Sequence, residues 1–248
     1  MGGVLIVTGG GRGIGAACAR LAGSRGFRVA VNYKANAERA EAVAEALRAT
    51  GGEAITIQAD VADEGEVIAM FETVDARLGP VTALINNAGM TGHVGRLTDF
   101  SAAEIDAVLR LNVTGAMVCA REAVKRMSTA QGGSGGVIVN ISSAAAQLGG
   151  ANQYLPYAAS KAALEAFTKG LGLEVAREGI RVVGLRPGVI DTEIHAAMGM
   201  PERARELAPT IPLGRAGSPE EVAQAALWLI GDDASYITAT TISVTGGR

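Results

Sequence analysis

Aromatic residues are scarce in this sequence, at 4% of its 248 positions, and histidine occurs only twice. No stretch is rich in Lys or Arg, and the formal net charge is −3. Nucleic-acid interfaces need a basic surface and often stacking aromatic rings, and anionic membranes attract basic surfaces. We therefore expect neither nucleic acid nor a membrane among the partners of this protein.

Long apolar runs are also absent, and cysteines are few. No run of about 20 apolar residues occurs, and residues 1–3 lead straight into the apolar run Val4–Val7 without a basic leader. These absences predict a soluble cytoplasmic protein. The two cysteines, Cys18 and Cys119, each lie in an apolar helical pattern, which favours buried, unpaired thiols over a disulfide.

Short runs rich in β-branched residues alternate with longer segments whose apolar residues recur at helical spacing. Continuous apolar strands, each followed by a helix, indicate a parallel sheet covered on both faces. The predicted strands are Val4–Thr8, Arg28–Asn32, Ala54–Gln58, Ala83–Asn86, Gly136–Ser142, Arg181–Arg186 and Thr241–Val244. The clearest predicted helices are Glu38–Thr50, Glu64–Leu78, Ala102–Met127 and Leu155–Glu178. The sequence therefore predicts one α/β domain over residues 1–248, a Rossmann-type, doubly wound parallel sheet of seven strands.

A glycine-rich turn, Thr8–Gly15, follows the first predicted strand and opens the first helix. Glycines there let backbone N–H groups come close to a diphosphate, and the helix N-terminus adds partial positive charge. A glycine-rich stretch alone is a weak sign. Its place at the start of an alternating α/β chain makes this one a predicted dinucleotide-binding turn.

Three further motifs follow the glycine turn in a set order. They are Asn86–Gly89 after the fourth predicted strand, Tyr157–Lys161 in a long predicted helix, and Arg186–Gly188 after the sixth strand. In these motifs the whole chain resembles the classical short-chain dehydrogenase/reductase family, most of all its glucose-dehydrogenase-like and 3-oxoacyl-carrier-protein-reductase-like members. The resemblance implies an NAD(P)-dependent enzyme of the EC 1.1.1 type that acts on a small-molecule carbonyl or alcohol, usually as a homotetramer.

The glycine turn and the resemblance together predict where the dinucleotide binds. Asp60 and Val61 resemble the family's adenine-contacting pair, and Thr192 resembles the residue that bonds the nicotinamide carboxamide. The predicted cofactor contacts are Gly9, Gly11, Arg12, Gly13, Ile14, Gly15, Asn32, Tyr33, Lys34, Asp60, Val61, Asn87, Ala88, Gly89, Tyr157, Lys161, Pro187, Gly188, Val189, Ile190 and Thr192.

The end of the second predicted strand bears on the choice of dinucleotide. NAD-selective sites place an acid there, which binds the ribose 2′-OH and repels a 2′-phosphate. Here the strand ends Val31–Lys34 with no acid, and Lys34 and Arg12 carry positive charge. The sequence therefore favours NADP(H) over NAD(H).

The predicted proton-transfer pair is Tyr157 and Lys161. Carbonyl reduction needs a proton for the developing alkoxide, but a tyrosine with a pKa of about 10 is a poor acid or base at neutral pH. A nearby ammonium stabilises the phenolate and lowers that pKa. The two residues are four positions apart on a predicted helix and so share one face.

A serine and an asparagine complete the predicted catalytic set. A hydroxyl at the end of the fifth strand can hydrogen-bond the substrate oxygen as it gains charge. The resemblance selects Ser143 for this role, with Ser142 as the alternative because adjacent strand residues face opposite ways. The resemblance also gives Asn112 a water-mediated link to Lys161.

Two segments beyond the strands are expected to shape substrate choice: residues 193–213, which carry Met198, and Ala144–Pro156, in which Tyr154 or Gln153 lines the pocket. Neither histidine, His93 or His195, has company at metal-ligand spacing, so no metal is expected. The substrate stays open among a sugar, a β-ketoacyl thioester and a small ketone.

Three functions remain open on the sequence. The first is an NADP(H)-dependent oxidoreductase with Tyr157 as the general acid/base. The second is an NAD(H)-dependent alcohol or sugar dehydrogenase. The third is a dinucleotide-binding regulator without catalysis, which would have no need for Asn112, Ser143, Tyr157 and Lys161 together.

Overall fold

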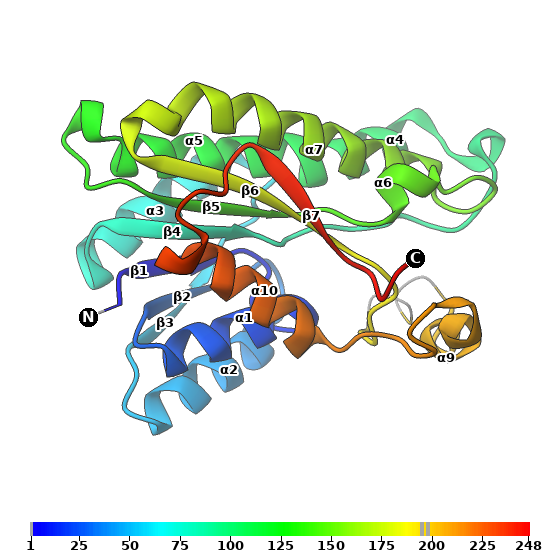
Figure 1. Cartoon of the computed structure of the whole chain (residues 1–248), viewed down its shortest axis with the longest axis horizontal. Coiled ribbons are helices and arrows are strands. Elements are labelled where there is room, and N and C mark those ends of the chain that lie inside the picture. Colours follow the sequence, from blue (N-terminus) through cyan, green and yellow to red (C-terminus); the bar gives the residue numbers. More distant parts are fainter. Residues whose placement is uncertain (1, 194–195, 197–198) are drawn as a thin grey trace.

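The computed structural model describes every residue except 1, 194–195 and 197–198. Seven parallel strands form one sheet in the order β3-β2-β1-β4-β5-β6-β7, which confirms the predicted fold (Figure 1). The strands are β1 Val4–Val7, β2 Arg28–Tyr33, β3 Ala54–Gln58, β4 Val81–Asn86, β5 Gly136–Ile141, β6 Ile180–Pro187 and β7 Thr240–Val244. β3 has the predicted bounds, and the ends of the other strands differ from the predicted ones by two residues at most.

Helices cover both faces of the sheet (Figure 1). The helices are α1 Gly13–Ser24, α2 Ala37–Ala49, α3 Glu64–Leu78, α4 Ala102–Leu109, α5 Ala116–Met127, α6 Ala145–Leu148, α7 Leu155–Val175, α9 Arg203–Leu207 and α10 Pro219–Ile230. Short 3₁₀ turns lie at Leu97–Asp99, Thr129–Gln131, Ala176–Glu178, Ala208–Thr210 and Asp232–Ala234. None of the helices in the described ranges is long and apolar enough to cross a bilayer.

Two hydrophobic layers hold the helices to the sheet, and β1 contributes residues to both. Leu5 and Val7 pack with residues of α1, α2 and α10, whereas Val4 and Ile6 pack with residues of α3 and α5. Alternate residues of a strand point to opposite faces, so a strand buried on both faces needs an apolar residue at every position. All four are fully buried, which explains why β1 reads as a continuous apolar run.

The two cysteines lie in different layers. Cys18 packs on the α1 side of the sheet and Cys119 on the α5 side, and both are free thiols, as predicted. Burial raises the pKa of each thiol to about 12, which keeps both protonated and unreactive at neutral pH.

The predicted helix Ala102–Met127 is helical over its whole length, but it contains a π-helical turn that the sequence did not predict. Residues Arg110–Gly115 form a π-helical segment between α4 and α5. Gly115 ends this segment, and a Cβ there would lie 2.6 Å from the carbonyl oxygen of Val61. The helix therefore passes close to the loop after β3, and Asn112 sits in the widened turn.

The order of the strands sets the place of a ligand. The chain leaves β1 toward β2 on one side and returns to β4 on the other. In open α/β sheets, ligands bind at the carboxyl ends of the strands beside such a switch point. The loops after β1, β2, β4, β5 and β6 meet there.

Candidate active site

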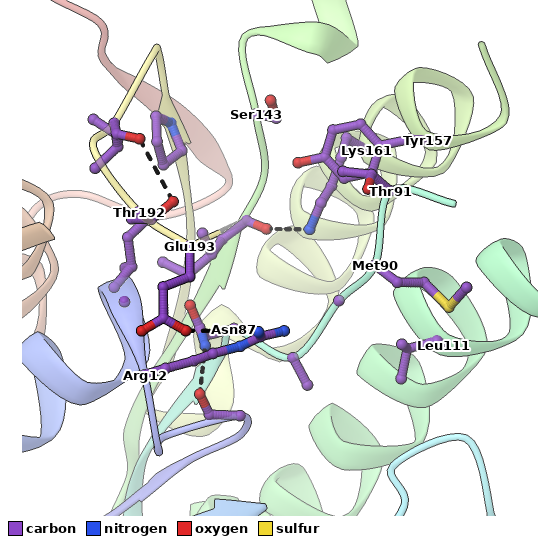
Figure 2. Close-up of a pocket in the computed structure, with 18 of the residues that line it drawn as sticks. Arg12, Asn87, Met90, Thr91, Leu111, Ser143, Tyr157, Lys161, Thr192 and Glu193 are labelled. Atoms are coloured by element: carbon purple, nitrogen blue, oxygen red, sulfur yellow. Dashed lines mark hydrogen bonds and ion pairs between the residues drawn. The ribbon is translucent and has the colours of Figure 1, made fainter. Parts of the chain in front are cut away.

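A cavity of about 660 Å³ opens at the carboxyl ends of the strands. Each predicted cofactor contact except Gly15 lines it, as do Ser143, Tyr157 and Lys161. Figure 2 shows Ser143 and Tyr157 at one end of this cavity and Arg12 at the other. Asn112 and Gly15 do not line the cavity, but each contacts residues that do.

The glycine turn presents backbone to the cavity. Gly9 has a φ of +61°, which glycine adopts without strain. Its N–H donates to Oδ1 of Asn32 at 3.2 Å, and the N–H of Gly10 donates to the Asn32 carbonyl at 2.8 Å. The side chain of Asn32 therefore stabilises the glycine turn instead of binding a ligand.

The N-terminus of α1 suits a diphosphate. Its N-cap, Arg12, makes no side-chain capping bond, and no acid occurs in the first turn. The first N–H groups of a helix have no partner within the helix, so they point at the cavity as anion-binding donors. The glycines leave this backbone uncovered, and the turn fits the diphosphate of a dinucleotide.

Gly15 supports the turn through close packing. A Cβ at this position would lie 2.4 Å from the carbonyl oxygen of Gly9 and 2.5 Å from Nδ2 of Asn87. We expect Gly15→Ala to lower the free energy of unfolding by about 1–3 kcal/mol, as overpacking does, and to weaken dinucleotide binding. Urea unfolding and cofactor titration measure the two effects.

Gly170 of α7 offers a matched control for that substitution. A Cβ there meets nothing within 4 Å in the chain, so Gly170→Ala is expected to raise helix stability by about 0.5–1 kcal/mol and leave cofactor binding alone. Equal stability and binding in Gly15→Ala and the parent protein would contradict the packing role of Gly15.

Thr8 and Asn87 join the glycine turn to the loop after β4. The hydroxyl of Thr8 accepts the N–H groups of Asn87 and Ala88 at 2.9 and 3.0 Å. In return, Nδ2 of Asn87 donates to the carbonyls of Thr8 and Gly9 at 2.9 and 3.1 Å. The sequence analysis placed Thr8 in the motif but assigned it no role.

Three cations line the end of the cavity beside β2, and each faces a carboxylate. Nζ of Lys34 lies 2.6 Å from Oδ2 of Asp60. Arg39 pairs with Glu193, and Nη1 of Arg12 lies 4.0 Å from the same carboxylate. The hydrogen bond and charge of Lys34 outweigh partial burial and lower the pKa of Asp60.

Arg39 was missed in the sequence analysis, which considered only the end of β2. Asn36 ends the loop after β2, and its Oδ1 accepts the N–H of Arg39 at 3.0 Å. This N-cap starts α2 directly at the cavity, so the first turn of α2 reaches the ligand space. An N-cap asparagine just after a strand, followed three residues later by an arginine, could have indicated from the sequence that Arg39 reaches the cavity.

Lys161 points from α7 into the cavity floor. It is 4% exposed, and its Nζ donates to the carbonyl of Ile141 at 2.7 Å. Nζ also lies 5.7 Å from the centroid of the Tyr157 ring. Burial lowers the pKa of Lys161 to about 8.

The sequence predicted that Lys161 would bring the pKa of Tyr157 below its usual value, whereas in the structure the net shift is upward. Burial raises the pKa of Tyr157 above 10.0, and a hydrogen bond with Ser143 opposes that rise. The ammonium of Lys161 is turned toward the carbonyl of Ile141, over the face of the ring rather than beside its hydroxyl. In this geometry burial dominates, and the phenol stays neutral at neutral pH.

The two serines after β5 point in different directions. Oγ of Ser142 is buried and donates to Oε1 of Glu165 at 2.8 Å. Oγ of Ser143 accepts the N–H of Ala145 at 3.1 Å, lines the cavity and lowers the pKa of Tyr157, partly opposing the effect of burial. The geometry therefore favours Ser143 over Ser142 as the hydroxyl that meets a substrate.

Asn112 in the π-helical segment is 1% exposed and hydrogen-bonded on both sides of its amide. Oδ1 accepts the N–H of Met90 at 2.9 Å, and Nδ2 donates to the Met90 carbonyl at 2.8 Å and to Oγ of Ser160 at 2.9 Å. Ser160 in turn donates to the Tyr157 carbonyl at 2.7 Å. Asn112 thus ties the wall at Met90 to the helix that carries Tyr157.

Gly89 separates Asn112 from Lys161. A Cβ at Gly89 would lie 3.1 Å from Oδ1 of Asn112 and 3.5 Å from Nζ of Lys161. A side chain here would fill the space between the two groups. The predicted water-mediated link between them stays a prediction, and Gly89 is the residue that leaves room for it.

Met90, Leu148, Tyr154 and Leu207 also line the cavity, and Tyr154 packs against Tyr157. Of the two residues expected to line it from the loop after β5, Tyr154 does so, whereas Gln153 bonds Arg203 from outside the lining. Arg203 of α9, which the sequence analysis did not single out, lines the cavity too.

His93 does not line the cavity. The ring of His93 stacks on Phe100, and its Nδ1 lies 3.0 Å from Oε1 of Glu104. His195 and Met198, which fall in the predicted substrate loop, lie outside the described residues. Within the described ranges, His, Cys, Asp and Glu side chains form no group of three or more that could hold a metal ion.

Comparison with known proteins agrees with this geometry. A family model described as Enoyl-(Acyl carrier protein) reductase matches residues 9–248. The chain is 48% identical over 245 residues to an uncharacterized oxidoreductase, YgfF, of Escherichia coli, with 99% of both chains covered.

Solved structures give the same result. A short-chain dehydrogenase/reductase from Serratia marcescens superposes with a TM-score of 0.91 at 35% identity, covering 100% of this chain and 98% of that one. A short chain dehydrogenase from Burkholderia cenocepacia in complex with NADP superposes with a TM-score of 0.89 at 34% identity, covering 98% and 96%.

Proposed function

Because the chain belongs to the short-chain dehydrogenase/reductase family of oxidoreductases, we propose that it interconverts a carbonyl and a secondary alcohol with NADP(H), using Tyr157 as the general acid/base. The observation that carries the proposal is the cluster of Ser143, Tyr157 and Lys161 at one end of a cavity whose other end is the glycine turn.

Side chains of the protein transfer the proton. When bound, the nicotinamide supplies or accepts the hydride. Tyr157 donates its phenolic proton to the oxygen that gains charge during reduction, and Ser143 hydrogen-bonds the same oxygen. Lys161 holds positive charge over the ring of Tyr157, where it stabilises the phenolate left behind. Asn112 hydrogen-bonds the backbone of Met90 and the Ser160 side chain of α7, and so fixes the cavity wall relative to Tyr157 and Lys161.

Preference for NADP(H) rests on charge at the β2 end of the cavity. No acid ends β2, and Arg12, Lys34 and Arg39 all line that region. Three cations suit a 2′-phosphate, which forms charge-assisted hydrogen bonds with arginine most readily. The solved relative from Burkholderia cenocepacia, determined with NADP, supports this reading.

One observation favours NAD(H) instead, as the second candidate. Lys34 already pairs with Asp60, and Arg39 and Arg12 face Glu193. A 2′-phosphate has to compete with these carboxylates for its cations. The cations of these pairs are about half exposed or more, so each pair contributes little and yields to a dianion.

Cofactor titration decides between the two. We expect the parent protein to bind NADPH at least about 10-fold more tightly than NADH, because each charge-assisted contact contributes roughly that factor. Lys34→Asp, Arg12→Ala and Arg39→Gln should each reduce this ratio, and fluorescence titration with either dinucleotide measures it.

Arg48 provides the matched control for these variants. It lies on α2 like Arg39 and pairs with Glu41, but it does not line the cavity. Arg48→Gln should leave both affinities unchanged. Equal or tighter binding of NADH by the parent protein would reject the NADP(H) proposal and establish the second candidate.

A further inference from the structure

The guanidinium of Arg203 stands in the substrate end of the cavity without a counter-charge. It donates to Oε1 of Gln153 at 2.6 Å, to the hydroxyl of Tyr154 at 3.2 Å and to the sulfur of Met200 at 3.2 Å. All three partners are neutral. Among the described residues, no carboxylate lies within ion-pair distance of Arg203, whereas Arg12 and Arg39 in the same cavity both face Glu193.

A half-buried cation with neutral partners retains capacity for an anion. Arginine has five N–H donors, and the three bonds of Arg203 leave two of them over. The partners also hold the group in place: Cζ lies 5.5 Å from the centroid of the Tyr154 ring. Arg203 is therefore a fixed donor rather than a free surface charge.

Arg203 is separated from the proton donor by one aromatic ring. The Tyr154 ring packs edge-on against Tyr157, with 5.9 Å between the ring centroids. Leu148 and Leu207, which line the same cavity, are apolar. A molecule with its carbonyl at Tyr157 and an apolar body along this wall would bring its far end to Arg203.

We propose that Arg203 binds a carboxylate of the substrate, so that the enzyme acts on an oxo acid, or the matching hydroxy acid, with an apolar segment between its two polar groups. Nη2 gives both of its N–H groups to Gln153 and Tyr154, so a carboxylate accepts from Nε or Nη1, or forms a paired contact by replacing the longer bond to the Tyr154 hydroxyl. This inference rests on the proposed function, since it places the reacting carbonyl at Tyr157.

Matched pairs of probes test the charge alone. The oxo acids 4-oxopentanoate, 5-oxohexanoate and 6-oxoheptanoate are compared with their primary amides, which keep the shape and remove the charge. NADPH oxidation gives kcat and KM for the parent protein, Arg203→Gln, Arg203→Lys and Arg205→Gln. Arg205 is the control on the same helix, because it pairs with Glu202 at 3.0 Å and its side chain is 82% exposed.

The parent protein is expected to prefer at least one acid over its amide by about 10-fold or more in kcat/KM. Arg203→Gln should lower kcat/KM for that acid about 10- to 100-fold, mainly through KM, and change the amide by less than about 3-fold. Arg203→Lys should restore part of the loss, and Arg205→Gln should match the parent protein.

Equal use of acids and amides by the parent protein, or an equal loss for both in Arg203→Gln, overturns the inference and leaves the proposed function standing. If the parent protein binds NADPH but reduces no probe, calorimetric titration of the acids into the NADP⁺ complex decides. Acid binding that Arg203→Gln weakens supports the inference, and no acid binding overturns it. A parent protein that binds neither dinucleotide refutes the proposed function itself, and the substrate assignment with it.

Discussion

Tyr157→Phe is expected to lower kcat/KM for carbonyl reduction by about 10²- to 10⁴-fold, the usual contribution of a positioned general acid. The ring that packs against Tyr154 and lies over Lys161 is kept, so the fold and the cofactor end of the cavity stay intact. Only the proton and the hydrogen bond with Ser143 are lost. Affinity for NADPH should therefore equal that of the parent protein.

Steady-state kinetics and NADPH titration measure the two quantities. Tyr236→Phe is the matched control, because it removes a phenolic hydroxyl from a fully exposed side chain that does not line the cavity. A loss below about 10-fold in Tyr157→Phe would assign the proton to another group. A parent protein that binds NADPH but turns over no carbonyl would point instead to the non-catalytic regulator.

The direction of the reaction should depend on pH through the same residue. Burial raises the pKa of Tyr157, and the hydrogen bond with Ser143 offsets part of the rise, so the neutral phenol prevails at neutral pH. Reduction uses that neutral acid, and oxidation needs the phenolate as base. In the parent protein, kcat/KM for alcohol oxidation should therefore rise with pH into the alkaline range, and Tyr157→Phe should abolish this rise.

Local patterns in the sequence were enough for the parts of the site that are built from neighbouring residues. The glycine turn lies within one strand–turn–helix, and Tyr157 and Lys161 lie within one helix. Continuous apolar runs between helical segments predicted the sheet. The π-helical turn was not predictable in this way, because the apolar spacing continues through Arg110–Gly115. The segment ends where Gly115 closely approaches Val61, a tertiary contact that the spacing of apolar residues does not reveal.

The charged groups that select ligands were harder to find. Arg39, Glu193 and Arg203 come from three separate segments, and only folding brings the first two into an ion pair. The direction of the Lys161 ammonium was also beyond a spacing argument. Four residues on a helix put Lys161 and Tyr157 on one face, but the carbonyl of Ile141 on β5 decides where Nζ points.

Lys161→Met should separate the activity of this site from its stability. The variant loses the cation over Tyr157 and with it the stabilised phenolate, so turnover should fall at least as far as in Tyr157→Phe. Yet the lysine is buried, and burial lowers its pKa from 10.5 to about 8. A buried charge disfavours folding, so the same substitution relieves a destabilising group.

The sign of the pH dependence follows from these two pKa values. Below pH 8 the lysine is protonated in both the folded and the unfolded protein, and the folded protein bears the full cost of the buried charge. Between pH 8 and pH 10.5 the folded protein has released the proton while the unfolded chain still holds it, so stability rises with pH. Above that range both forms are neutral and the cost is gone. With 1.36 kcal/mol per pKa unit, the change is about 3 kcal/mol.

Unfolding by urea at a series of pH values measures this, with Tyr157→Phe as the background so that the phenol does not titrate. We expect the stability difference between the Tyr157→Phe/Lys161→Met protein and the Tyr157→Phe protein to shift in favour of the lysine form by about 3 kcal/mol from pH 7 to alkaline pH. The lost hydrogen bond to the Ile141 carbonyl costs about 1–3 kcal/mol at every pH, since a neutral amine also donates, and so cancels from the shift. A difference that stays flat with pH would mean that Lys161 titrates normally in the folded protein, and the charge that assists Tyr157 would then carry no cost in stability.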